Sequence, residues 1–220
     1  AGLLALGTWA LFSVSVAASL VGAGAIALFA SREGISPARL ALIGVSISAL
    51  TAAAATGILA EARIFSSQSL YFIGGSFTNL SWQDVLPVLP FFGVGILLAL
   101  PVVGNLNVMG LGDRVAANLG AEPARTRALA IASAGILGGA AVAVAGLVGF
   151  VGLLVPHLAR LLVGHDFRRI FIVSIPLGAA FVLYADQAAR LLFMPSEIPV
   201  GLVTAIVGAP LMIYVARRVL

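Results

Sequence analysis

Long stretches without a charged residue alternate with short polar segments along the whole chain. A helix needs about 20 apolar residues to cross the hydrocarbon core of a bilayer. Measured against that length, the apolar stretches predict seven membrane spans, at residues 9–30, 40–60, 86–103, 128–145, 150–163, 170–192 and 198–215. We therefore expect an all-α fold, a polytopic transmembrane helical bundle that forms a single domain over residues 1–220.

The interval between Arg127 and Arg168 is divided into two of these spans. Its roughly 40 residues are too many for one crossing and barely enough for two. Both ends are rich in arginine, so we place them on the same side of the membrane, which requires two crossings. Gly146, Gly149 and Gly152 are expected to supply the tight reversal, because glycine adopts backbone angles that other residues avoid.

Composition agrees with a membrane protein and excludes several activities. The 220 residues are 61% hydrophobic and 9% charged, and the mean hydropathy is +1.17, far from the soluble range of about a quarter charged. Cysteine is absent, which excludes disulfides and cysteine metal sites. All basic residues except two histidines are arginines, so the lysine of a nucleotide-binding P-loop is missing. Any ATP hydrolysis must therefore take place on another chain.

The distribution of arginine predicts the orientation. With the spans above, one side of the membrane carries only Arg63, and the other carries nine arginines: Arg32, Arg39, Arg114, Arg125, Arg127, Arg168, Arg169, Arg217 and Arg218. Positive residues are enriched in cytoplasmic loops. We therefore expect residues 105–127 and the C-terminus in the cytoplasm, and residues 61–85 outside, with a helical turn at 66–75. Trp9 and Trp82 would lie near the external interface.

Residues 105–127 form a polar segment with an apolar stripe. Leu111, Val115 and Leu119 recur every fourth residue, so a helix would place them on one face. Gly120 and Pro123 are expected to end that helix. A helix of about two turns is not stable alone in water, so the stripe requires a partner surface.

Few polar residues lie inside the spans. His157 has no partner for catalysis or metal binding, and we expect a structural role for it. Asp186 and Arg190 are spaced for a helical ion pair, and two hypotheses remain open, a neutralised pair or an external docking charge at Arg190. Asp186 is the only acid within a predicted span, which argues against a proton-coupled or sodium-coupled carrier. No HExxH motif or serine–histidine arrangement supports a hydrolase, so we predict no enzyme activity in this chain.

Several motifs resemble one family. They are Leu111-Gly112-Asp113 through Leu119-Gly120, the segment GFVGLLVPHLAR at 149–160, EIPVG at 197–201, and Gly208-Ala209-Pro210. Together they resemble the permease subunits of ABC importers for ferric siderophores, haem and cobalamin, over essentially the whole chain. The resemblance implies a ten-helix permease fold with two copies around a central pathway, in the bacterial inner membrane. This chain shows seven spans and starts without methionine, so we expect it to lack the first three helices.

The resemblance also implies roles for individual residues. The segment 107–122 corresponds to the coupling helices that contact the ATPase subunit, with Leu111, Gly112, Asp113, Arg114, Val115, Leu119 and Gly120 as the coupling residues. Arg190 corresponds to an arginine that docks the substrate-binding protein. Ile35 and Ser36 fall in the loop that narrows the cytoplasmic end of the pathway. Pathway-lining residues are expected in the second and seventh spans, among them Ser46, Thr51, Thr204 and Gly208.

The function implied is therefore that of a transmembrane permease moving an iron-siderophore, haem or cobalamin-type chelate into the cytoplasm. Its partners would be an ATPase subunit that holds ATP and magnesium, a substrate-binding protein, a second permease copy and lipid. No cofactor is expected in this chain. An ion-coupled secondary transporter and a non-transporting membrane scaffold remain as alternatives.

Overall fold

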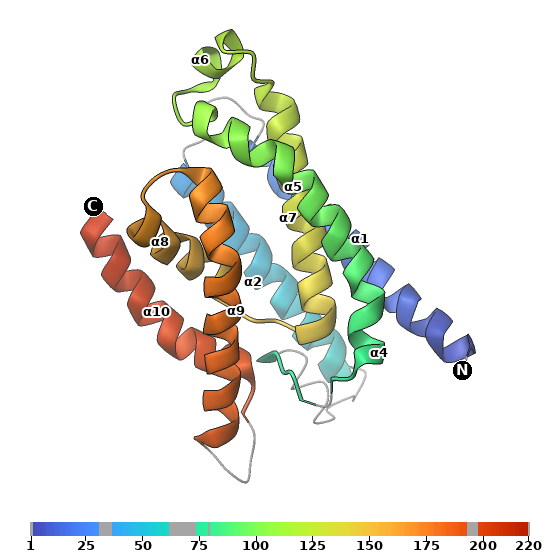
Figure 1. The fold of residues 1–220 in the computed structure, drawn as a ribbon. Coiled ribbons are helices and arrows are strands. Elements are labelled where there is room, and N and C mark those ends of the chain that lie inside the picture. Colours follow the sequence, from blue (N-terminus) through green and yellow to red (C-terminus); the bar gives the residue numbers. More distant parts are fainter. Residues whose placement is uncertain (1, 31–36, 62–73, 79, 193–197, 220) are drawn as a thin grey trace. The chain divides into compact units, whose positions relative to one another are not determined.

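The computed structural model describes residues 2–30, 37–61, 74–78, 80–192 and 198–219 (Figure 1). Within these ranges the regular elements are all helical. They are α1 (Gly2–Ala30), α2 (Pro37–Glu61), α4 (Trp82–Val85), the 3-10 helix η1 (Leu86–Val88), α5 (Leu89–Met109), α6 (Asp113–Asn118), α7 (Pro123–Ala145), α8 (Val151–Val163), α9 (Phe167–Leu191) and α10 (Val200–Val219).

The apolar helices confirm the predicted transmembrane bundle. Among the described residues, three helical stretches are long and apolar enough to cross a membrane: Trp82–Met109, Pro123–Ala145 and Phe167–Leu191. Four shorter apolar stretches are Ser13–Leu28, Leu42–Gly57, Val151–Val163 and Val200–Ile213. Each of the seven coincides with one predicted span. Many large apolar side chains on these helices are exposed in the isolated chain, as expected for surfaces that contact lipid or other subunits.

Contacts divide the chain into two compact units. Unit 1 contains residues 1–70, 81–102 and 124–144, and unit 2 contains residues 71–80, 103–123 and 145–220. Of the helices, α5 and α7 contribute to both units. The prediction that the chain forms a single domain stays a prediction.

Small residues allow the helices of unit 1 to approach closely. Ser133 Oγ donates a hydrogen bond to the carbonyl oxygen of Gly95 at 2.8 Å, which joins α7 to α5. Ser19 Oγ donates to the carbonyl oxygen of Gly135 at 2.8 Å, which joins α1 to α7. A Cβ on Gly139 would lie 2.9 Å from the Cα of Val16 in α1, so glycine is required there. This is the packing expected in a membrane, where small residues and interhelical hydrogen bonds hold helices together.

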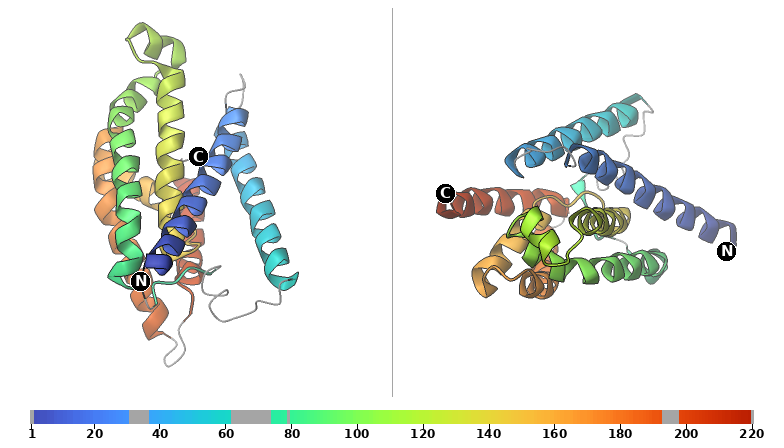
Figure 2. Two further views of the ribbon diagram at one scale, coloured as in Figure 1. Left: turned by 90° about the vertical axis from the view of Figure 1, so that its right-hand side faces the viewer. Right: turned by 90° about the horizontal axis from the view of Figure 1, so that it is seen from above.

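Unit 2 is built on α8, α9 and α10, which pack on one another (Figure 2). Its core includes Ala185 and Ala189 of α9 with Val200 and Val203 of α10. Leu154 of α8 is fully buried. Pairing alanine on α9 with valine on α10 lets the two helices lie close without a cavity.

The reversal between α7 and α8 differs in detail from the prediction. Gly146 has φ +68°, as expected of a glycine in a turn. The second residue with positive φ is Phe150, with φ +66°, at the N-cap of α8. Gly149 and Gly152, which were expected to share this role, have ordinary backbone angles. The strain of the reversal therefore falls on a non-glycine residue, at a cost of roughly 1–2 kcal/mol.

Candidate functional site

The predicted coupling helix is α6, a short helix between two glycine turns. Its N-cap is Gly112, with φ +100°, and the chain leaves it through Gly120, with φ +84°. The amide of Ala121 donates to the carbonyl oxygen of Ala116 at 3.0 Å, which closes the C-terminal end. Gly120 thus ends the helix as predicted. Pro123 does not act as a stop but begins α7, where its missing amide hydrogen has no cost.

The helices on either side are longer than predicted. Because α5 continues to Met109 and α7 starts at Pro123, most of the polar segment 105–127 is helical, and α6 itself has six residues. Polar residues such as Asn107 belong to the last turns of α5, which extend beyond the apolar run that defined the predicted span.

An apolar face of α6 points away from its own chain. Ala116 is fully buried, whereas the exposed fraction is 45% for Val115 and 65% for Leu119. Leu111, predicted to belong to the same helical stripe, instead lies in the turn before α6 and is 65% exposed. The helix therefore attaches to the protein through Ala116 and presents Val115 and Leu119 outward.

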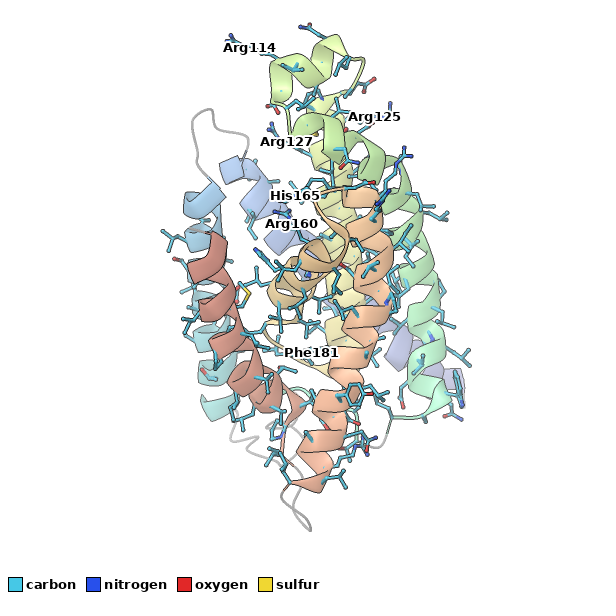
Figure 3. All side chains as sticks on the ribbon, turned by 60° about the vertical axis from the view of Figure 1, so that its left-hand side comes forward. Arg114, Arg125, Arg127, Arg160, His165 and Phe181 are labelled. Atoms are coloured by element: carbon cyan, nitrogen blue, oxygen red, sulfur yellow. The ribbon has the colours of Figure 1, made fainter. Side chains whose placement is uncertain are left out.

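The charged and glycine positions of this segment are also exposed. Asp113 occupies the first turn of α6, where an acid is favourable because the helix dipole is positive there. Arg114 follows it and is also exposed (Figure 3). A Cβ on Gly112 or Gly120 would find open space, so it is their positive φ that requires glycine.

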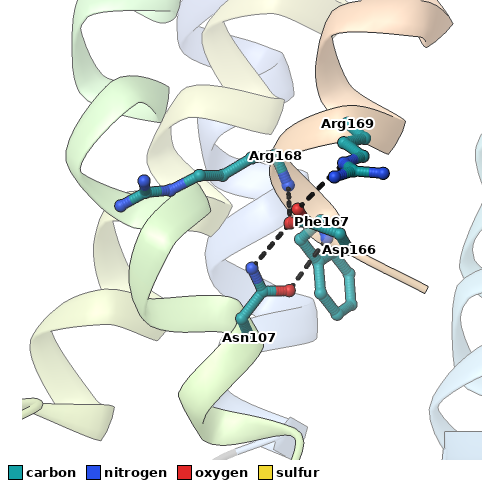
Figure 4. Close-up of polar contacts among 5 residues, drawn as sticks. All are labelled: Asn107, Asp166, Phe167, Arg168 and Arg169. Carbon is teal, nitrogen blue, oxygen red and sulfur yellow. Dashed lines mark hydrogen bonds and ion pairs between the residues drawn. The ribbon is translucent and has the colours of Figure 1, made fainter. Parts of the chain in front are cut away.

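A hydrogen-bonded clamp at the end of α5 was not predicted (Figure 4). The side-chain amide of Asn107 donates to Asp166 Oδ1 at 2.8 Å, and its carbonyl oxygen accepts from the Phe167 amide at 2.8 Å. Asp166 also accepts from the Arg168 amide at 2.9 Å and so caps α9. Arg169 Nε lies 3.6 Å from Asp166 Oδ2. The clamp joins the helix that leads into α6 to the first turn of α9.

The same hydrogen bonds affect the ionisation of the Asp166 carboxyl group. The hydrogen bond from Asn107, followed by the one from the Arg168 amide, holds the pKa of Asp166 below its ordinary value of 3.8. The carboxylate is therefore ionised at neutral pH. The available sequence signal was an aspartate shortly before the span predicted from residue 170, a residue type common at helix N-caps, but nothing local identified Asn107 as its partner.

Three segments that are far apart in the sequence meet in unit 2. The Ser76 amide donates to the Ala145 carbonyl oxygen, and the Val200 amide donates to the Gly75 carbonyl oxygen, both at 2.9 Å. A Cβ on Gly75 would lie 2.7 Å from the carbonyl oxygen of Leu147. A Cβ on Gly201 would lie equally close to that oxygen. We call this arrangement of residues 74–76, 145–147 and 199–201 the glycine junction.

The residues predicted to line the pathway lie in different environments. Ser46 and Thr51 are exposed on α2, and their hydroxyls donate to the carbonyl oxygens of Leu42 and Ile47 in the same helix. Thr204 is fully buried in unit 2, where its hydroxyl donates to the Gly201 carbonyl oxygen at 3.0 Å.

Gly208 is also buried, and a Cβ there would lie 2.6 Å from Phe150 Cβ. Buried positions do not contact a substrate in this arrangement of unit 2, whereas Ser46 and Thr51 are accessible. The predicted gate residues Ile35 and Ser36 lie outside the described residues, and so do residues 66–73 of the turn predicted at 66–75.

Arg190 and Asp186 form the ion pair that their spacing predicted. Arg190 Nε lies 2.9 Å from Asp186 Oδ2. The exposed fraction is 37% for the arginine side chain and 13% for the aspartate. The pair neutralises Asp186, and part of Arg190 stays accessible to a partner.

The histidine in α8 bonds to its own helix. His157 Nδ1 lies 2.8 Å from the Leu153 carbonyl oxygen, which fixes Nδ1 as the protonated nitrogen. Among the described residues, no group of three histidine, aspartate or glutamate side chains could hold a metal ion. This geometry supports a structural role for His157.

The apolar helices define the class as a polytopic membrane protein, and the described residues add a short exposed helix between two glycine turns. The model of the FecCD transport family matches residues 1–218. The chain belongs to this family, which confirms the resemblance found in its motifs.

Individual relatives support the same family. The chain is 39% identical over 206 residues to the Fe(3+)-citrate import system permease protein YfmD of Bacillus subtilis, covering 92% of this chain and 60% of that protein. It is 36% identical to the cobalamin import system permease protein BtuC of Halobacterium salinarum, with 91% and 54% covered. It is 37% identical to the Fe(3+) dicitrate transport system permease protein FecC of Escherichia coli, with 82% and 54% covered. The chain thus spans 54% to 60% of the length of these relatives.

A solved structure has the same fold. It is described as an inward-facing conformation of a metal-chelate type ABC transporter, and it superposes with a TM-score of 0.70 at 29% identity. The match covers 97% of this chain and 71% of that one.

Proposed function

We propose that the protein is a transmembrane permease subunit of an ATP-driven ABC importer that moves an iron-siderophore, haem or cobalamin-type chelate into the cytoplasm. The family supports this assignment, and so do the names of the relatives, which include iron-citrate and cobalamin permeases. In this proposal ATP and magnesium are bound by a separate ATPase subunit.

The observation that carries the proposal is the outward apolar face of α6. Val115 and Leu119 are accessible, and Ala116 is the one residue of α6 that is buried against the rest of the chain. A groove on the ATPase subunit would bury both side chains and supply the partner that so short a helix needs. Leu111, in the preceding turn, would extend the same contact.

The clamp supplies a mechanical connection for this contact. Residues 103–123 belong to the same compact unit as α8, α9 and α10. Asn107, four residues before Leu111 of the turn that leads into α6, is bonded to the N-cap and the first amide of α9. Displacement of α6 by the ATPase would therefore be transmitted to α9 and the helices packed on it, and the permease would alternate its access between the two sides.

The remaining roles follow from the orientation that arginine predicts. The C-terminus and α6 would lie in the cytoplasm, and the glycine junction would lie near the outer face. Arg190 would dock the substrate-binding protein through the part of its side chain that Asp186 leaves accessible. Ile35 and Ser36 would narrow the cytoplasmic end of the pathway, and a second permease copy would complete it. Ser46, Thr51, Thr204 and Gly208 would line it, the last two after rearrangement of unit 2.

The carboxylates argue against an ion-coupled carrier. Among the described side chains, Asp84 and Asp186 are the acids within candidate spans. Asp84 accepts hydrogen bonds from the backbone and hydroxyl of Ser81, and Asp186 is paired with Arg190. Neither is a free acid of the kind that binds a coupling ion.

The test is uptake of ferric citrate, ferric siderophores, haem or cobalamin into proteoliposomes that contain the permease, its ATPase and the loaded binding protein. The proposal expects uptake that requires internal ATP, persists without an ion gradient, and is lost when the ATPase is omitted. Uptake driven by a proton or sodium gradient without the ATPase would indicate a secondary transporter. An absence of flux together with stable binding to other membrane proteins would indicate a scaffold.

A further inference from the structure

Unit 2 contains a cavity of about 230 Å³ beside the clamp. The last turns of α5, the middle of α8 and the first half of α9 form its walls. Most of the lining is apolar, from Val103, Leu106, Pro156, Ile170 and Phe171. This cavity has no part in the coupling contact proposed above.

Two polar groups reach this apolar space. Arg160, in the last turn of α8, is the one charged residue among those that line it (Figure 3). Its Cζ lies 5.9 Å from the centre of the Phe167 ring, so the guanidinium is held over an aromatic face. Ser174 also lines the cavity, and its buried hydroxyl has no hydrogen-bond partner among the described residues.

The acid that precedes Phe167 in the chain is already engaged. Asp166 binds Asn107 and the Arg168 amide, and its ion-pair partner is Arg169. Among the described side chains, no carboxylate forms an ion pair with Arg160. The lining of the cavity therefore carries one uncompensated positive charge, at Arg160, among walls that suit hydrocarbon.

The size of the cavity limits its ligand. Drug-sized ligands occupy pockets of about 300–1,000 Å³, so a bulky metal chelate does not fit. An apolar cavity of about 150 Å³ takes up benzene, so 230 Å³ accommodates a stretch of hydrocarbon chain. Basic pockets between transmembrane helices are known to bind anionic lipid headgroups.

We propose that this cavity binds an anionic phospholipid, with part of one acyl chain between α5, α8 and α9 and the phosphate at Arg160. A phosphate oxygen accepts hydrogen bonds from the guanidinium, and the apolar walls exclude water from the chain. The lipid would bridge α8 to α5 and α9, the two helices that the clamp joins, and would stabilise all three as a unit.

The test uses the assembled transporter in detergent, with lipid binding measured by native mass spectrometry. Phosphatidylglycerol is titrated against phosphatidylcholine for the wild type and for Arg160→Gln. The matched control is Arg169→Gln, which removes one positive charge from the same end of unit 2 but does not line the cavity. We expect Arg160→Gln to weaken phosphatidylglycerol binding about tenfold, the loss of one charge-assisted hydrogen bond, and Arg169→Gln to change it less than twofold.

Further variants separate the site from general attraction of anions. Arg160→Lys should keep the preference for phosphatidylglycerol, and Ser174→Leu should reduce binding of both lipids by filling the cavity. If Ser174→Leu does not assemble, the comparison of Arg160→Gln with Arg169→Gln decides the outcome. Equal loss in Arg160→Gln and Arg169→Gln would overturn the proposal, because the attraction would then be diffuse. Displacement of the lipid by millimolar inorganic phosphate would also overturn it, since the site would then recognise a free anion. The measurement needs no transport activity, so its result is independent of the proposed function.

Discussion

Truncating the outward face of α6 should weaken the complex with the ATPase by a calculable amount. Fully burying a valine or leucine side chain contributes roughly 1.5–3 kcal/mol relative to leaving it in water. Val115 and Leu119 are 45% and 65% exposed in the chain alone, so a docking groove removes about that fraction of each from water. The double change Val115→Ala and Leu119→Ala should therefore cost about 2 kcal/mol of binding free energy, or roughly 30-fold in Kd.

The effect should appear in binding and not in folding. Substitutions at exposed positions usually change stability by less than about 0.5 kcal/mol, so the melting temperature of the permease should hardly move. The assay is titration of the ATPase subunit onto the permease in nanodiscs. Asn118→Ala is the matched control, because Asn118 is an exposed residue of the same helix outside the apolar face. Changing both residues to aspartate should leave no measurable complex, since an unpaired charge in an apolar groove loses its hydration. The reasoning is refuted if the double alanine variant binds the ATPase as tightly as Asn118→Ala.

Three further predictions concern other parts of the molecule. Gly201→Ala places a Cβ against the backbone of the glycine junction and should destabilise the protein by about 1–3 kcal/mol. The control is Gly152→Ala, whose Cβ meets open space and should not lower the melting temperature. Equal melting temperatures for the two variants would contradict this prediction. Asn107→Ala should raise the pKa of Asp166 towards 3.8. Because the native pKa lies below that of the unfolded chain, the part of the stability loss that comes from the Asp166 carboxylate should be constant above pH 3.8 and vanish as pH falls through the lower native pKa, whereas the part from the lost bond to the Phe167 amide should not depend on pH. Urea unfolding over this pH range measures the stability difference, and a difference that shrinks near neutral pH would exclude the mechanism. Arg190→Glu should weaken binding-protein association more at low salt than at high salt if Arg190 docks that protein, whereas a variant that fails to accumulate would show that pairing with Asp186 is its main role.

Short-range features of the fold could be predicted from the sequence because their causes are local. The thickness of the bilayer limits the length of an apolar helix, so the charge-free runs alone marked the seven spans. Asp186 and Arg190 pair because four residues bring side chains together on any helix. Gly120 has a positive φ, which glycine adopts readily and residues with a side chain disfavour, so a glycine at this position is a local signal for the end of α6.

Long-range features depended on which faces of the helices pack. Helices α2 and α10 have only a weak amphipathic pattern, so their sequence does not distinguish a face against lipid from a face against another helix. The burial of Thr204 and the exposure of Thr51 could therefore not be told apart beforehand.

The clamp and the glycine junction join segments that are far apart along the chain. Asn107 and Asp166 are 59 residues apart, and each is unremarkable in its own segment. The class of the protein, its spans and a short helix within residues 105–127 could be predicted from the order of residues alone. The partner of each polar group and each glycine became known from the packed helices, because such contacts leave no periodic signal in any one helix.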